Sequence, residues 1–185
     1  MTSHALSEDG ATNIVVVTTL HKAQLFLEAA RHYKKLYWSP AWDRLAANPD
    51  IHEGMAAFFQ EAAGILTSQD APCGCLIILA ATNVSAEGQA INDTLKELRE
   101  EGLDCFLTRI KRAIVDGQLP PDTNTPAMAV AANTMLDGMS LRARDGVSRS
   151  ELEQVGAIAM SMFRKELLGA AGSVGGKAHG KPGRQ

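Results

Sequence analysis

Residues Pro72 to Asn83 read Pro-Cys-Gly-Cys-Leu-Ile-Ile-Leu-Ala-Ala-Thr-Asn, and this apolar stretch decides the fold class. It is too short to cross a membrane, for which a helix needs roughly 18 apolar residues. A segment with no polar face is buried all round, whether it is a helix or a strand. Its neighbours follow helical patterns and no strand-like run nearby pairs with it, so we predict a short buried helix.

The residues before this stretch follow the spacing of amphipathic helices. The clearest pattern runs from Ile51 to Leu66, where apolar residues recur at steps of three and four. Asp50 followed by Glu53 resembles a capping box at its start. An earlier helical face extends from Leu20 to Tyr37, and Ser39-Pro40 is expected to interrupt it before a further short helix.

Three more helices are expected after the apolar stretch. A long one should run from Ala86 to Val115 with Ser85 as its cap, and Thr125-Pro126 should cap and start the next. Ser148 and Glu151 form a capping box for the last. The connections are short and no credible sheet is present, so the sequence predicts an all-α single domain of about six helices.

The two ends of the chain differ in composition from its middle. Residues 1–19 are mostly small and polar, apart from the β-branched run Ile14 to Thr19, and are expected to be a disordered leader or the remnant of another domain. Residues 20–168 carry the helical patterns. Residues 169–185 are rich in Gly, Ala and Lys, which is typical of a flexible tail.

Composition narrows the class of protein. The 185 residues are 45% hydrophobic and 21% charged, which is ordinary for a globular domain. A net charge of -3 gives no electrostatic reason for the whole chain to bind nucleic acid. Three cysteines without a signal peptide indicate reduced thiols and a cytoplasmic location. No membrane segment, metal site or cofactor motif is expected.

Four short motifs stand in order along the chain, and they are Lys22-Ala23-Gln24-Leu25-Phe26, Gly74-Cys75-Leu76-Ile77, Gly117-Gln118-Leu119-Pro120, and Asp137-Gly138-Met139-Ser140 through Arg142-Ala143-Arg144-Asp145-Gly146. Together they resemble the C-terminal half of the TetR-like transcription regulators, from the fourth helix of that family to its eighth. The resemblance covers about Leu20 to Phe163. It implies a C-terminal helical bundle that binds a small apolar effector and forms a homodimer.

The family places a DNA-binding domain before the first of these motifs, and a domain that puts a helix in the major groove needs roughly 45 residues. Here Lys22 has only 21 residues before it. Where the family has a tyrosine and a phenylalanine, this chain has Val16 and Thr19, and the run Ile14 to Thr19 has no basic residue to bind phosphate. We therefore expect no DNA-binding residue in this chain, and DNA binding only by a full-length form.

Methionines and aromatic residues on the inward helix faces are the candidate lining of an effector cavity, because methionine adapts to varied apolar partners. Plain core packing is the alternative for each of them. The resemblance favours the cavity for Met55, Phe58, Phe59, Cys75, Leu79, Leu98, Phe106 and Met135.

The last two helices are the candidate dimer interface, since in the family they pair with their copies in a second subunit. Small residues such as Ala131, Gly138 and Gly156 permit close helix approach. Packing within one chain is the alternative. The residues expected at the interface are Met128, Ala131, Met139, Leu152, Val155, Ala159, Met162 and Phe163.

The resemblance implies a regulator in which an effector shifts the helix holding Leu25 to Tyr33 and so controls the DNA binding of the full-length form. One alternative is a stand-alone helical dimer that binds a ligand or acts as an adaptor without DNA. Another is a helical enzyme, for which no nucleophile–base pair is present. Cys73-x-Cys75 lacks the further ligands of a metal site and the spacing of a redox pair, so buried structural thiols are expected.

Overall fold

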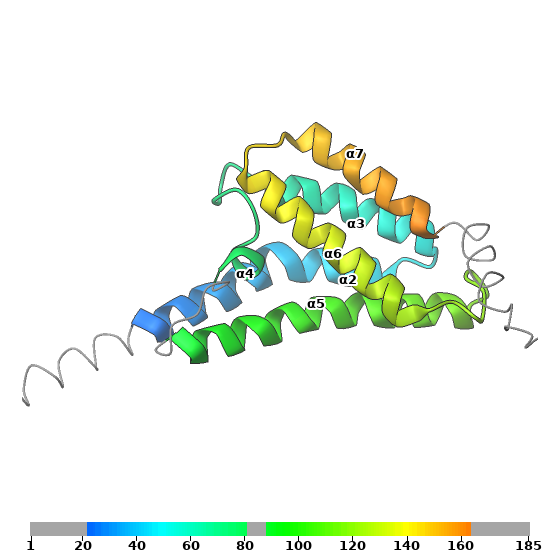
Figure 1. The fold of residues 1–185 in the computed structure, drawn as a ribbon, viewed down its shortest axis with the longest axis horizontal. Helices are drawn as coiled ribbons and strands as arrows, with labels where there is room; N and C mark the ends of the chain where they lie inside the picture. Colours follow the sequence, from blue (N-terminus) through cyan, green and yellow to red (C-terminus); the bar gives the residue numbers. More distant parts are fainter. Residues whose placement is uncertain (1–21, 81–87, 164–185) are drawn as a thin grey trace, which may run out of the picture.

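The structure is a computed structural model that describes residues 22–80 and 88–163. Every regular element in these ranges is helical, and the all-α prediction is confirmed (Figure 1). None of the helices in these ranges has the length and apolarity to cross a membrane. The predicted leader (1–19) and tail (169–185) lie outside the described residues.

The first helical segment lines one side of the molecule. Residues 22–33 are helical and continue through the π-helix η1 (Lys34–Trp38) into α2 (Ser39–Ala47). The expected interruption at Ser39-Pro40 is wrong, because the backbone stays right-handed through Ser39, whose N–H donates to the Lys34 carbonyl. Pro40 has no N–H and crowds the preceding turn, and the wider π turn accommodates it. Ser39 therefore makes no cap.

Helix α3 (Ile51–Leu66) lies in the middle of the bundle, against α7, α2 and α6 (Figure 1). The Asp50 carboxylate accepts a hydrogen bond from the Glu53 N–H at 2.9 Å, so Asp50 caps the helix as predicted. The second bond of a capping box is not formed, because the Asp50 N–H donates to the Asn48 side chain at 2.9 Å. One stripe of the helix is wholly buried, which follows from the apolar periodicity of its sequence. The buried residues are Ile51, Gly54, Met55, Phe58, Phe59, Ala62, Ala63 and Leu66.

The described part of the apolar stretch after α3 forms a short helix, α4 (Leu76–Leu79), as predicted, and residues 81–83 lie outside the described residues. Cys73 is exposed, so the prediction that the stretch is buried all round is wrong at its start. The cause is a turn at Gly74, where φ is +85°. A Cβ there would lie 2.5 Å from the Leu79 Cδ1 and 2.9 Å from the Ser140 carbonyl oxygen, so this turn requires glycine.

Helix α5 (Gln89–Val115) runs the length of the molecule beneath α2 and α6 (Figure 1). It ends at Asp116 and Gly117, whose φ is +71°, as the Asp-Gly pair predicts. The expected cap, Ser85, lies outside the described residues.

Two helices complete the bundle, α6 (Thr125–Arg144) and α7 (Arg149–Ala159), followed by the 3-10 helix η3 (Met160–Phe163). Asn124 caps α6, since its side chain accepts from the Ala127 N–H, so the cap predicted at Thr125 is one residue too late. Both hydrogen bonds of the predicted Ser148–Glu151 capping box are present in α7.

An aromatic cluster fills the centre of the bundle. Phe58 and Phe106 meet edge to face with ring centroids 5.2 Å apart, and Trp42 lies 4.3 Å from Phe58. Phe59 completes the cluster from α3, 5.8 Å from Phe58. Such edge-to-face pairs are favourable beyond the area they bury, so this cluster fixes α2, α3 and α5 against one another.

Candidate functional site

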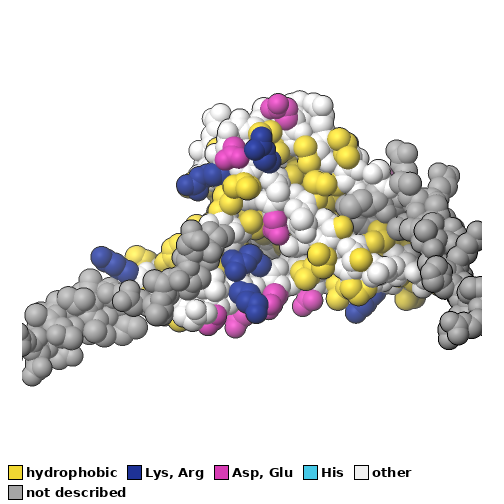
Figure 2. Space-filling view, viewed as in Figure 1, with side chains coloured by type: hydrophobic (Ala, Val, Ile, Leu, Met, Phe, Trp, Pro, Cys, Tyr) yellow, Lys and Arg dark blue, Asp and Glu magenta, His cyan; other side chains and the backbone are white. Residues whose placement is uncertain are grey.

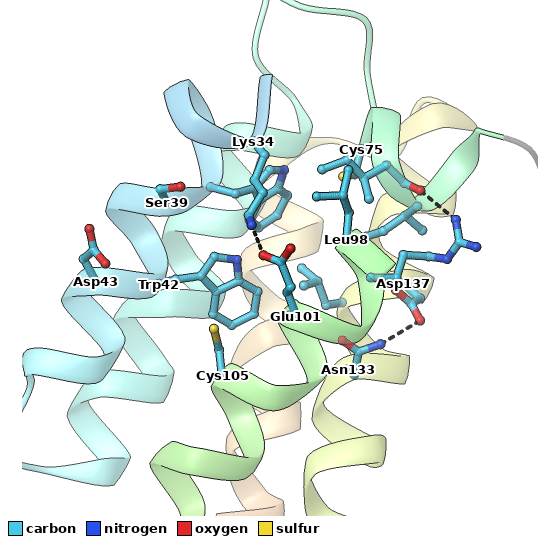
Figure 3. A pocket seen from close by; sticks show the side chains of 16 residues that line it. Lys34, Ser39, Trp42, Asp43, Cys75, Leu98, Glu101, Cys105, Asn133 and Asp137 are labelled. Atoms are coloured by element: carbon cyan, nitrogen blue, oxygen red, sulfur yellow. Dashed lines mark hydrogen bonds and ion pairs between the residues drawn. The ribbon is translucent and has the colours of Figure 1, made fainter. Parts of the chain in front are cut away.

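A cavity of about 220 Å³ lies beside the aromatic cluster, between the first helical segment, α4, α5 and α6 (Figure 3). We call it the Trp38–Gly102 cavity. It is open to solvent on one side and mostly apolar inside. Its lining residues are Lys34, Trp38, Ser39, Trp42, Asp43, Cys75, Ile77, Ile78, Leu98, Arg99, Glu101, Gly102, Cys105, Asn133, Leu136 and Asp137.

Two tryptophans, the only two in the sequence, form the aromatic wall of the cavity. Trp38 and Trp42 stand one helical turn apart, with ring centroids separated by 6.3 Å. The indole N–H of Trp38 is buried and has no hydrogen-bond partner among the described residues. Tyr33 and Cys75 are its neighbours, and burial raises the pKa of both side chains, so each stays protonated and uncharged.

Gly102 keeps the cavity open from the α5 side. A Cβ at this position would lie 3.4 Å from Trp42 Cζ2 and would project into the space between α5 and α2. Glycine in the middle of a helix costs about 1 kcal/mol relative to alanine. Gly74 and Gly117 have the positive φ angles that favour glycine, whereas Gly102 lies inside a regular helix. The physical reason for glycine at this position is therefore the space that its missing side chain leaves.

Polar groups surround the apolar interior. The Lys34 ammonium forms an ion pair with Glu101 that joins η1 to α5 (Figure 3). Deeper in the bundle, the Arg99 guanidinium donates to the Ile77 carbonyl oxygen at 3.1 Å. The Asn133 amide donates to the Asp137 carboxylate at 3.1 Å, while burial raises the pKa of Asp137.

The cysteines give the cavity no reactive centre. All three thiols are free, and burial raises the pKa of Cys75 and of Cys105, which favours the unreactive thiol. The described residues contain no group of three or more side chains placed to hold a metal ion.

The residues predicted to bind the effector fall into three groups. Cys75 and Leu98 line the cavity. Leu79 and Met135 are half-buried beside it without lining it. The remaining four lie in the filled core at 2% exposure or less and do not line the cavity, and they are Met55, Phe58, Phe59 and Phe106.

Sequence reasoning missed the two tryptophans and Gly102 as parts of this site. Trp38 and Trp42 are four residues apart and so share one helix face, which is a readable signal once the helix is continuous through Ser39. An interruption at Ser39-Pro40 would separate the two tryptophans, which is why the shared face depends on the continuous helix.

The residues predicted at the dimer interface are also divided. Four of them are buried within the chain itself, at 8% exposure or less, and they are Met128, Met139, Leu152 and Ala159. Ala131 and Val155 are half-buried at the edge of the outer face. The side chains of Met162 and Phe163 lie outside the described part of the chain.

The outer face of α6 and α7 carries the exposed apolar side chains of this region (Figure 2). Val130 and Leu141 are each 52% exposed, and Ile158 is 68% exposed. Gly138 lies on the same face, and a Cβ there would meet no atom within 4 Å. Neither a turn nor a contact with any of the described residues requires glycine at that position.

The arrangement defines a class of protein, an all-α domain with a central cavity and an apolar outer face, and comparison with known proteins gives its family. Residues 53–158, more than half of the chain, match the family model described as the tetracyclin repressor-like C-terminal domain. The chain belongs to the TetR family of transcriptional regulators.

Individual relatives agree with this assignment. The TetR family transcriptional regulator CifR, solved with operator DNA, is 35% identical with a TM-score of 0.72, over 76% of this chain and 73% of that one. A putative TetR regulator from Rhodococcus sp. RHA1 is 26% identical with a TM-score of 0.59, over 69% and 68% of the two chains.

A curated relative is the HTH-type transcriptional repressor ComR of Escherichia coli (strain K12), 28% identical over 138 residues. The match covers 73% of this chain and 60% of the length of ComR. The described chain is helical from residue 22, and the expected loss of the DNA-binding half is not confirmed. Residues Ile14 to Thr19, on which that expectation depended, lie outside the described residues.

Proposed function

We propose that residues 22–163 are the effector-binding and dimerisation part of a TetR-type regulator, and that a small, mostly apolar molecule binds in the Trp38–Gly102 cavity. The observation that carries this proposal is an apolar cavity held open by a mid-helix glycine beside both tryptophans of the chain. A helix position that gives up about 1 kcal/mol to leave space is expected where a ligand must enter.

The effector acts through the first helical segment. Trp38 and Ser39 line the cavity and belong to the same continuous helix as residues 22–33. A π turn holds an extra residue per turn and occurs often at functional sites, and η1 lies at the cavity. An effector that contacts Trp38 therefore favours one arrangement of this segment over another, and the shift reaches residues 22–33, the end next to which DNA-binding domains of the family are attached.

The Lys34–Glu101 ion pair limits how far this segment moves, because it joins η1 directly to α5. It lies partly exposed, where an ion pair contributes about 0–1 kcal/mol. An effector that binds the shifted arrangement more tightly than the resting one by more than this energy overcomes the pair, which otherwise sets the resting position.

The proposed dimer uses the outer face of α6 and α7. The exposed side chains of Val130, Leu141 and Ile158 are unfavourable in water and are covered in the proposed two-fold pair. Gly138 on this face lets a second helix approach closely. The expected test result is a dimer by light scattering that becomes a monomer in Ile158→Glu. A wild-type monomer at micromolar concentration contradicts the proposal.

The ligand site is tested by a thermal-shift screen of small apolar compounds, neutral and charged, against wild type and Gly102→Leu. The leucine fills the cavity from α5, so compounds that stabilise wild type are expected to have no effect on the variant. Ala90→Leu is the matched control, because it adds an exposed leucine to the same helix away from the cavity. A screen without hits, or hits that persist in Gly102→Leu, contradicts the site.

DNA control is tested with the full-length protein and DNA from its own promoter in a gel-shift assay. CifR was solved in complex with operator DNA and ComR is a transcriptional repressor, and both relatives support this part of the proposal. The expected result is a shifted band that a hit from the ligand screen weakens. A shift that no cavity ligand alters contradicts the proposed coupling.

A further inference from the structure

The polar groups of the Trp38–Gly102 cavity carry unequal charge. Three carboxylates line it, those of Asp43, Glu101 and Asp137, against two cations, Lys34 and Arg99. The Lys34 ammonium is already paired with Glu101. One negative charge is therefore in excess among the lining residues. Asp43 and Glu101 are exposed to solvent, so the carboxylate that faces the apolar interior with the least screening is the half-buried Asp137.

Asp137 is the carboxylate with the least compensation. It is half-buried on α6, and its one hydrogen bond among the described residues comes from the Asn133 amide at 3.1 Å. It forms no ion pair with any of the described residues. Burial raises the pKa of Asp137 while the Arg99 charge lowers it, and burial has the larger effect.

Arg99 does not neutralise Asp137 by contact. Its guanidinium donates to the Ile77 carbonyl oxygen at 3.1 Å, which holds it against α4. In the close view of the cavity, Asp137 and Asn133 lie on the α6 side, across from Trp42 and Lys34 (Figure 3). A ligand in the cavity is thus placed between a carboxylate and an aromatic wall.

The aromatic wall suits a cation. The faces of indole rings attract ammonium groups within about 6 Å of the ring centroid, and tryptophan does so best. Trp42 is held firmly in place, 4.3 Å from Phe58 and 4.9 Å from Phe106 between centroids. Its position therefore costs little entropy to maintain when a ligand binds.

We propose that the Trp38–Gly102 cavity binds a small organic cation, an ammonium group on an apolar body, with Asp137 as its counter-charge. The inference rests on the proposed effector site and narrows the chemistry of its ligand. The apolar body contacts Ile77 and Leu98, and the ammonium lies between Asp137 and the tryptophans. An anionic ligand is disfavoured because it would meet the uncompensated Asp137 carboxylate in an apolar setting.

The test compares phenyltrimethylammonium with tert-butylbenzene, which has the same shape with a neutral carbon in place of the charged nitrogen. Calorimetric titration of the full chain is expected to show the ammonium binding about tenfold more tightly than the hydrocarbon, from the cation–π and carboxylate contacts. In Asp137→Asn, which retains an acceptor for Asn133, the preference is expected to disappear.

The control variant is Asp122→Asn, which makes the same change of charge on an exposed loop between α5 and α6 and should keep the preference. The wild-type comparison stands even if Asp137→Asn does not fold. Hydrocarbon binding as tight as ammonium binding overturns the inference and leaves the apolar effector site standing. A preference that survives in folded Asp137→Asn overturns the role of Asp137. Binding of neither compound overturns the cation inference, while the thermal-shift screen with Gly102→Leu decides the effector site separately.

Discussion

The filled core and the Trp38–Gly102 cavity lie side by side and share Trp42, yet they are built differently. In the core, Phe58, Phe59 and Phe106 are at most 2% exposed and their rings pack edge to face or stacked. In the cavity, Gly102 and a lining in which some side chains are charged leave a space of about 220 Å³. The same helices α2 and α5 border both regions, so a few positions rather than a separate element distinguish the open cavity from the filled core.

The largest expected effect comes from truncation in the core. Phe106→Ala should lower the free energy of unfolding by about 3–5 kcal/mol, because it removes a buried ring and leaves a hole among fixed neighbours. Leu98→Ala, at the half-buried cavity wall, should cost about 1 kcal/mol, because less apolar surface is lost from contact. Urea unfolding monitored by circular dichroism measures both. Equal costs would show that the cavity wall is packed like the core.

A second pair of substitutions compares two helix glycines. Gly156→Ala should destabilise the protein by about 1–3 kcal/mol, since its Cβ would lie only 2.9 Å from the Phe59 Cβ across the α3–α7 contact. Gly102→Ala should instead stabilise it by up to about 1 kcal/mol, because the methyl fits beside Trp42 and helix propensity improves. Thermal unfolding decides this, and a destabilised Gly102→Ala would contradict an open space at that position.

A smaller effect is expected at the cap of α7, which lies away from both regions. Ser148→Ala removes the capping box and should cost about 1 kcal/mol without changing ligand binding. Chemical unfolding measures the loss of stability, and ligand titration measures whether binding is unchanged. A loss of binding would mean that α7 is coupled to the cavity after all.

The smallest expected effect is a dependence of stability on pH, and it comes from the same Ser148–Glu151 capping box. Hydrogen bonds from Ser148 lower the pKa of Glu151, so its contribution is present above the ordinary carboxyl pKa of 4.5 and is lost as pH falls through the lower folded value. Unfolding midpoints of wild type should therefore fall more steeply below pH 4.5 than those of Glu151→Gln. Parallel pH profiles would contradict the assignment.

Local signals in the sequence predicted the helices well, because apolar periodicity and capping depend on residues only a few positions apart. The caps at Asp50 and Ser148 and the stop at Gly117 are of this kind. The π turn at Lys34–Trp38 was not predictable, since the signal at Pro40 is the same for a break and for a wider turn.

The cavity was only partly predictable, because it depends on packing between distant segments. Cys75 and Leu98 were named from the family resemblance, and both line it. Trp38 and Asp137 are about a hundred residues apart, and no spacing rule within one helix brings them together. Four predicted ligand-binding residues, Met55, Phe58, Phe59 and Phe106, lie in the core instead. Residues that line a ligand site and residues that fill a core have the same apolar periodicity, so the sequence pattern alone does not distinguish them.

The central claim is that the Trp38–Gly102 cavity is the effector site of this TetR-family chain. Because the only two tryptophans line it, their fluorescence reports its occupancy directly. Titration with a compound that stabilises wild type in the thermal-shift screen should change the emission of wild type in a saturable way and leave that of Gly102→Leu unchanged. An unchanged emission in wild type, or the same saturable change in Gly102→Leu, would contradict the claim.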